Sequence, residues 1–178
     1  MRADANRLRI EMQRRVQSWS PARGDIARWA SVALGRRAAG YELGVRVVGA
    51  AESRRLNSRF RGKDRPTNVL SFPAAPITRR SRASPSGPPY RALSGIPGSP
   101  ASVTRPLGDL VICPQVLRAE AREQQKSLRA HWAHLVVHGA LHLIGYDHER
   151  EAEASRMERR DIRVLRSLGF ANPYRSSC

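Results

Sequence analysis

The spacing of apolar residues along the chain predicts a short series of strands and helices. Short runs that are apolar, or that alternate apolar with polar residues, are typical of β-strands. Longer runs with an apolar residue every three or four positions are typical of helices. The predicted strands are residues 8–13, 41–48, 68–72 and 107–112. The predicted helices are residues 21–34, 50–60, 114–124, 128–144 and 149–168.

Several of these elements carry residues typical of helix ends. Ser20 followed by Pro21 predicts an N-cap and a first helical residue, because proline lacks the amide hydrogen that this position leaves unused. Ser127 is a second candidate N-cap. Gly145 is expected to end the following helix near residue 144, since glycine adopts the left-handed cap conformation without steric cost.

The order of the predicted elements favours an α+β fold, with a small mixed sheet of about four strands packed with helices. The strands and helices do not alternate in a regular βαβ rhythm. A chain of 178 residues is long enough for one domain with a real core, so we expect one domain over residues 1–178. Residues 73–106 contain eight of the twelve prolines, five arginines and no acidic residue, which predicts a flexible basic loop within that domain. This insert is either an RNA-contacting arm or an unselected insertion.

The net charge indicates the class of partner. Thirty-two Lys and Arg residues against fifteen Asp and Glu give +17, and such a chain attracts polyanions. The charge favours nucleic acid as the partner, the alternative being an ordinary protein of arginine-rich composition. No uninterrupted apolar run is long enough to cross a membrane, and no apolar run follows the basic N-terminus as in a secretory signal. Two cysteines, Cys113 and Cys178, do not make a disulfide framework, and we expect a cytoplasmic protein.

Histidines gather in the stretch HGALHLIGYDH, residues 138–148. Residues four apart on a helix project from the same face, so His138 and His142 present two imidazoles side by side. A chain that turns at Gly145 can bring His148 to the same ion. Three nitrogen ligands with a fourth position open is the arrangement of a catalytic zinc site, and we expect one zinc ion on this central helix and the loop that follows it.

Two observations limit this interpretation. His131 and His134 lie on the same predicted helix, and histidines in such a helix are often satisfied by hydrogen bonds alone; we expect these two to be supporting or structural residues. The spacing also matches the metal-binding pattern of metzincin proteases, in which a glutamate after the first histidine is the general base. That position is Gly139 here, so the usual route to peptide hydrolysis is absent.

A second group of residues suits phosphodiester chemistry. Arg61, Lys63 and Arg65 lie just before the third predicted strand. Cleavage of a phosphodiester needs positive charge at the phosphoryl oxygens, and a guanidinium is well shaped to supply it. Together with a zinc site in a strongly basic chain, these three residues are candidates for RNA binding.

Three blocks of the sequence occur in a recognisable order: AESRRLNSRFRGKDRPTNVLSFP (51–73), LGDLVIC (107–113) and HWAHLVVHGALHLIGYDH (131–148). Together they resemble the YbeY family of bacterial endoribonucleases and rRNA maturation factors. The C-terminal MERRDIRVLRSLGFANPY is also similar, so the resemblance covers most of the chain from Tyr41 onward except the insert.

The resemblance implies zinc-dependent cleavage of single-stranded RNA, 16S rRNA 3′-end maturation and ribosome quality control. It implies that His138, His142 and His148 bind the zinc ion and that Arg61 is the catalytic basic residue facing it. Phe60 replaces the family's tyrosine before that arginine. The implied partners are rRNA precursors, the small ribosomal subunit with one of its proteins, and an Era-like GTPase.

Several alternatives stay open at the level of sequence. Asp109 and Asp147 either orient a ligand histidine or cap a turn. The attacking group is either water or the ribose 2′-hydroxyl. A non-catalytic ribosome assembly factor with structural zinc is the main rival function, and a zinc protease is a weaker one.

Overall fold

The structure, a computed structural model, describes residues 8–74, 105–146 and 151–174. These residues form a four-stranded sheet and five α-helices, with one short 3-10 helix, η1. The strands are β1 (Arg9–Arg14), β2 (Tyr41–Val47), β3 (Val69–Pro73) and β4 (Arg105–Ile112). The helices are α1 (Arg23–Leu34), η1 (Gly35–Ala38), α2 (Ala50–Arg61), α3 (Pro114–Glu123), α4 (Leu128–Leu143) and α5 (Glu151–Ser167).

The sheet is mixed and has the order β1-β2-β4-β3. β1, β2 and β4 are parallel, and β3 is an antiparallel edge strand paired with β4. The α+β prediction with a mixed sheet of about four strands is therefore confirmed. One feature of the sheet was not predicted: β1, α1 and β2 form a parallel βαβ unit.

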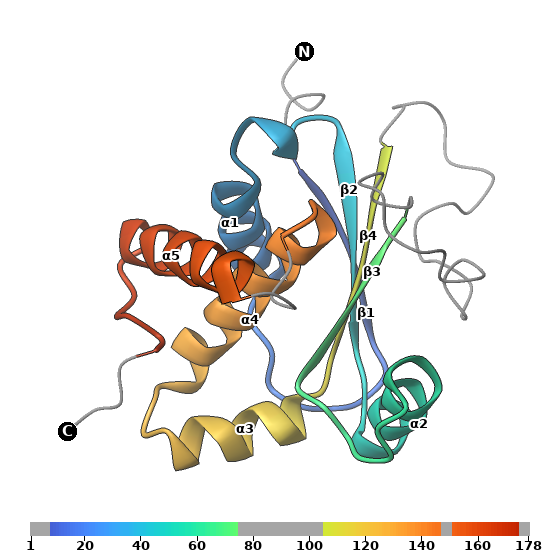
Figure 1. Cartoon of the computed structure of the whole chain (residues 1–178). Helices are drawn as coiled ribbons and strands as arrows, with labels where there is room; N and C mark the ends of the chain where they lie inside the picture. The colour runs from blue at the N-terminus through green and yellow to red at the C-terminus, as the bar shows by residue number, and fades with distance from the viewer. Residues whose placement is uncertain (1–7, 75–104, 147–150, 175–178) are drawn as a thin grey trace.

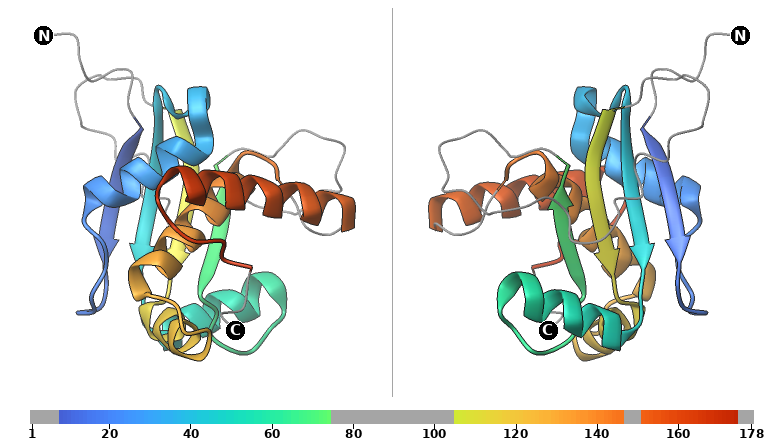
Figure 2. Two further views of the ribbon diagram at one scale, coloured as in Figure 1. Left: turned by 90° about the vertical axis from the view of Figure 1, so that its left-hand side faces the viewer. Right: turned by 90° about the vertical axis from the view of Figure 1, so that its right-hand side faces the viewer.

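Helices α1, α4 and α5 form two layers on one face of the sheet (Figures 1 and 2). α1 and α4 lie against the strands, and α5 packs on α4 farther from the sheet. α2 contributes Leu56 to a smaller apolar cluster with Leu70 and Val111 from β3 and β4. Alternate residues of those strands belong to the two clusters, so α2 covers part of the opposite face.

α4 is the central helix of the domain. It contacts β3, β4, α1, α3 and α5, and most of its residues are buried. Trp132, Val136, Val137 and Leu141 are fully buried in the main core. A helix that is apolar on nearly every side is held by its surroundings and has little freedom to tilt, so its few polar side chains are firmly positioned.

The helix-end predictions had different outcomes. Ser127 does cap α4, because its Oγ accepts a hydrogen bond from the backbone N–H of Ala130 at 3.1 Å. Gly145 follows the helix with a positive φ of 93°, as expected. The prediction for Ser20 was wrong: α1 begins at Arg23, and the Ser20 hydroxyl instead accepts a hydrogen bond from Arg14 Nε at 3.0 Å.

The predicted loop 73–106 is shorter than expected at both ends. Pro73 is the last residue of β3, where an edge strand tolerates proline. Arg105 and Pro106 begin β4. Residues 75–104 lie outside the described part of the chain, so the flexibility of the insert and the extent of the domain stay predictions. Among the described helices, none is long and apolar enough to span a membrane.

Candidate metal centre and RNA-cleavage site

Three histidines form a row along one face of α4. His134, His138 and His142 are spaced four residues apart, and each is partly exposed, whereas every residue between them is buried. Their rings follow one another closely, with centroids 5.8 Å apart for His134 and His138 and 4.7 Å apart for His138 and His142. The sequence prediction that His138 and His142 lie side by side is confirmed.

His138 and His142 point their Nε2 atoms at each other. The two atoms are 3.2 Å apart. Two nitrogen ligands of a tetrahedral zinc ion, each bonded at 2.0–2.1 Å, are separated by about 3.3 Å. The described pair therefore has the spacing of two corners of a zinc tetrahedron.

The other ring nitrogen of His138 is held by a buried carboxylate. Its Nδ1 lies 2.9 Å from Oδ2 of Asp161, a fully buried residue of α5. In the neutral imidazole, donation from Nδ1 to this carboxylate leaves Nε2 without a proton, with its lone pair toward His142. The phenolic O–H of Tyr174 donates to the same Oδ2 at 2.6 Å. Metal-bound histidines are commonly oriented by a carboxylate in this way, so the arrangement fits a metal site.

A different grouping of the same residues could also hold a metal ion. His134, His138 and Asp161 offer ligand atoms that all lie within 4.8 Å of one another. Burial is the main cause that lowers the pKa of His134, to about 4, so its ring is neutral near pH 7 and could act as a ligand. In this grouping the metal would replace the hydrogen bonds that Asp161 accepts from His138 and Tyr174.

Sequence reasoning missed Asp161 and Tyr174. The sequence did contain one indication of Asp161. This acid lies between Met157 and Leu165 on the apolar face of α5, where burial of an unpaired carboxylate is costly and a partner is therefore expected. Asp109 lies on the opposite face of the sheet from α4, where the charges that influence it belong to β1 and β2, so it does not orient His138 or His142. His148 and Asp147 lie outside the described residues.

The basic residues at the end of α2 gather around a tight turn. Arg61 ends α2, Gly62 caps it in the left-handed conformation with φ 66°, and Lys63 and Arg65 follow. All three basic side chains are exposed. They are thus available to an RNA strand, and the role of Arg61 beside the metal stays a prediction.

Phe60 anchors this turn to the edge of the sheet. Its ring makes an edge-to-face contact with Phe72 of β3, with centroids 5.4 Å apart. The residue that replaces the family's tyrosine therefore acts here through ring packing. On the other face of the same strand, α4 packs against Ser71 at Gly139. α2 and α4 thus flank one edge strand from opposite sides.

Gly139 has no room for a side chain. A Cβ at this position would lie 2.7 Å from Leu110 Cδ2 and 3.2 Å from Ser71 Oγ. Gly139 therefore faces the sheet, and a larger residue here would push α4 away from it. A glutamate cannot be accommodated at the position that carries the general base in metzincin proteases.

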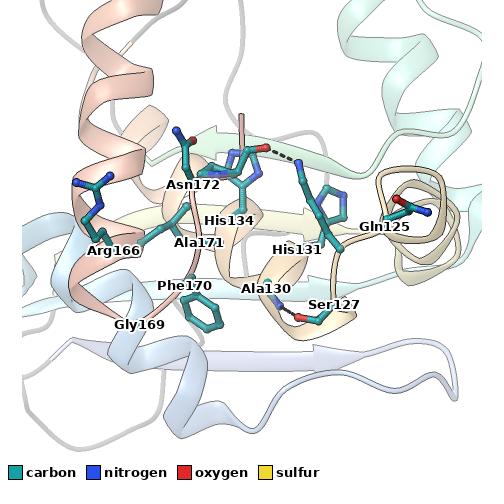
Figure 3. Close-up of a pocket in the computed structure, with 13 residues that line it drawn as sticks. Gln125, Ser127, Ala130, His131, His134, Arg166, Gly169, Phe170, Ala171 and Asn172 are labelled. Carbon is teal, nitrogen blue, oxygen red and sulfur yellow. Dashed lines mark hydrogen bonds between the residues drawn. The ribbon is translucent and has the colours of Figure 1, made fainter. Parts of the chain in front are cut away.

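A cavity of about 710 Å³ adjoins the histidine row (Figure 3). His131 and His134 line it from α4, and Arg166 and Phe170 line it from the end of α5 and the segment that follows. His131 Nε2 lies 2.9 Å from a carboxylate oxygen of Glu120, which supports its expected structural role. The cavity connects the surface near His134 with the C-terminal end of α5.

Two comparisons match this chain with known proteins, and one of them, the family model, shows its family. A solution structure of TM1509 from Thermotoga maritima is 20% identical, and the match covers 94% of this chain and 99% of that one with a TM-score of 0.49. The family model described as "Endoribonuclease YbeY" matches residues 11–169. That match spans both candidate groups, the basic turn after α2 and the histidine row of α4. The chain therefore belongs to the YbeY family, and it is an endoribonuclease of rRNA processing whose substrate is RNA.

Proposed function

We propose that this chain is a zinc-dependent endoribonuclease specific for single-stranded RNA, which matures the 3′ end of 16S rRNA and takes part in ribosome quality control. His138, His142 and His148 would bind one zinc ion, and Arg61 would be the catalytic residue that contacts the phosphoryl oxygens. Arg61, Lys63 and Arg65 would bind the RNA. The proposal rests on family membership and on the paired imidazoles of α4.

The observation that carries the metal assignment is the 3.2 Å separation of the two Nε2 atoms. It is supported by Asp161, which fixes the ring orientation of His138 through Nδ1 and so leaves Nε2 for a metal. We favour Asp161 as an orienting residue over a direct ligand. Its Oδ2 already accepts two hydrogen bonds, including the short one from Tyr174.

Each part of the chain has a separate task in this proposal. Bound zinc supplies Lewis acidity, which polarises a phosphoryl oxygen or lowers the pKa of a bound water. Arg61 places a planar, permanently charged guanidinium where the phosphate gains negative charge. The contact between Phe60 and Phe72 fixes the end of α2 at the edge strand that α4 also borders. A position of Arg61 beside the histidine pair is itself part of the proposal.

The protein partners proposed from the family are a small-subunit ribosomal protein and an Era-like GTPase. They would bring the enzyme to the small subunit, where the 3′ end of 16S rRNA is processed. A cytoplasmic location follows from this assignment.

Cleavage of a single-stranded RNA by His142→Ala and Arg61→Ala tests the proposal. We expect both variants to lose cleavage. His142→Ala should retain the fold and RNA binding, because the His142 side chain is only partly buried at the helix surface. Arg55→Ala is the matched control for Arg61→Ala, since Arg55 is an exposed arginine on the same helix. Wild-type cleavage by His142→Ala would refute the metal assignment.

The same variants separate an enzyme from an assembly factor with structural zinc. For structural zinc, His142→Ala would lower the melting temperature in step with the loss of activity. For the proposed enzyme, the metal-free fold persists, because α4 is held by contacts with the sheet and three other helices.

A further inference from the structure

α5 carries a row of arginines on its outer face. Arg156, Arg159, Arg163 and Arg166 follow one another at intervals of three or four residues, and all four are exposed. At about 100° per residue, they fall within an arc of about 80°. At about 1.5 Å per residue, the row is about 15 Å long. We call these four residues the arginine row.

The arginine row lies opposite the buried face of α5. Met157, Asp161, Val164 and Leu165 are the buried residues of this helix, and they point toward the body of the protein. Figure 2 shows that α5 is the outer layer of helices. Because its buried residues face inward, the row faces away from the sheet and from α4. Arg160, by contrast, turns inward and donates a hydrogen bond to the backbone carbonyl of Ala33 at 3.4 Å.

The charges of the row are not neutralised by the described parts of the chain. No ion pair within residues 8–74, 105–146 and 151–174 includes any of its four guanidinium groups. Like charges three or four residues apart destabilise a helix. An ordinary solvated helix face mixes acidic with basic residues, whereas the face at positions 152, 155, 156, 159, 162, 163 and 166 contains no acid. The row therefore has the character of a binding surface for a polyanion.

The row is continuous with the surface that leads to the histidines. Arg159, Arg163 and Arg166 border a shallow hollow on the outside of α5. Arg166 also lines the cavity that contains His134, as Figure 3 shows. His134 is the neighbour of His138 in the histidine row. A strand bound at the metal centre can thus continue past the cavity to the end of α5.

We propose that the arginine row binds the phosphate backbone of single-stranded RNA at nucleotides away from the cleavage site. The identity of this polyanion rests on the proposed function. A single file of charges on one helix matches a single backbone, and guanidinium groups pair well with phosphate oxygens. The row extends the substrate-binding surface to a part of the molecule that performs no chemistry.

Salt-dependent binding of a fluorescent oligouridylate to the full chain tests this proposal. For single-stranded nucleic acid, each neutralised phosphate contributes about 0.7 to the slope of log affinity against log salt. Replacing all four arginines by glutamine is expected to reduce that slope by about 2.8, if each contacts one phosphate. At about 0.1 M salt the affinity would then fall by as much as several hundred-fold.

The matched control removes the same charge from scattered places. Arg9, Arg23, Arg37 and Arg122 are exposed on β1, α1, η1 and α3, and their replacement by glutamine should change the slope little. Replacement of the row by four lysines should retain most of the slope, since charge alone neutralises phosphate. Equal slopes for the row and control variants would overturn the proposal, because total charge would then account for binding.

A second measurement separates RNA from an anionic lipid surface. Binding to vesicles of phosphatidylcholine and phosphatidylserine should be weak and should not distinguish the row variant from the control. Loss of vesicle binding by the row variant, with its RNA slope unchanged, would overturn the proposal in favour of a membrane surface. Because the readout is RNA affinity and not cleavage, a negative result leaves the metal assignment of the proposed function untouched.

Discussion

Asp161→Asn should weaken zinc binding without abolishing it. Both hydrogen bonds that Asp161 accepts, from His138 and from Tyr174, end on Oδ2, whereas Oδ1 is buried and has no hydrogen-bond partner among the described residues. Asparagine can present its carbonyl oxygen to both donors and its amide group where Oδ1 lies. The substitution therefore keeps the shape and removes the charge.

The size of the effect follows from the loss of that charge. A hydrogen bond to an ionised acceptor is about twice as strong as a neutral one. Loss of a partner that orients a metal-bound histidine typically reduces metal affinity 10- to 100-fold, which is about 1.4–2.7 kcal/mol. We expect Asp161→Asn to fall in this range, measured at neutral pH by competition with a chromophoric zinc chelator.

Two further variants decide between the possible ligand sets. If His138 and His142 bind the metal, His142→Ala loses high-affinity binding and His134→Asn keeps it within a few-fold. If His134, His138 and Asp161 are the ligands, the order reverses and Asp161→Asn loses binding altogether. Unchanged zinc affinity in Asp161→Asn would refute both roles for this carboxylate.

Three other substitutions test the scaffold. Gly108→Ala should lower the free energy of unfolding by about 2–4 kcal/mol in urea melts, because φ is 141° and a Cβ would lie 2.3 Å from the Phe72 carbonyl oxygen; wild-type stability would refute this. Burial is the main cause that raises the pKa of Asp109 to about 6. Protonation of this carboxyl therefore stabilises the folded state, and the stabilisation is present below pH 4 and lost as pH rises through 6. Asp109→Asn should therefore raise the free energy of unfolding at pH 7 by up to about 3 kcal/mol and flatten its change between pH 4 and 6; an unaltered pH profile would contradict this. Ser127→Ala should cost about 1 kcal/mol by removing the bond to Ala130 N–H, whereas Ser127→Asp should retain stability in the same melts.

Local features of the site could be predicted from sequence. The four-residue spacing of His138 and His142 fixes their common face on any helix, and Ser127 and Gly145 mark where that helix begins and ends. Gly139 was recognised as the absence of a general base. This position is a glycine because Leu110 of the sheet packs directly against it, and no residue pattern within the helix predicts that contact.

Features that depend on tertiary contacts could not be predicted in this way. Asp161 lies 23 residues beyond His138, and the two meet only because α5 packs on α4. Tyr174 reaches the same carboxylate from the segment after α5. The parallel pairing of β1 with β2 likewise depends on a crossover through α1, and alternation along a strand does not identify its neighbour.

Titration of metal-free protein with zinc, with RNA cleavage measured at each addition, tests the central claim most directly. The metal-free protein should be inactive, and the cleavage rate should rise in proportion to added zinc until one ion is bound per chain. The His142→Ala variant should remain inactive throughout. Full cleavage by the metal-free protein, or zinc binding that leaves the rate unchanged, would contradict the account.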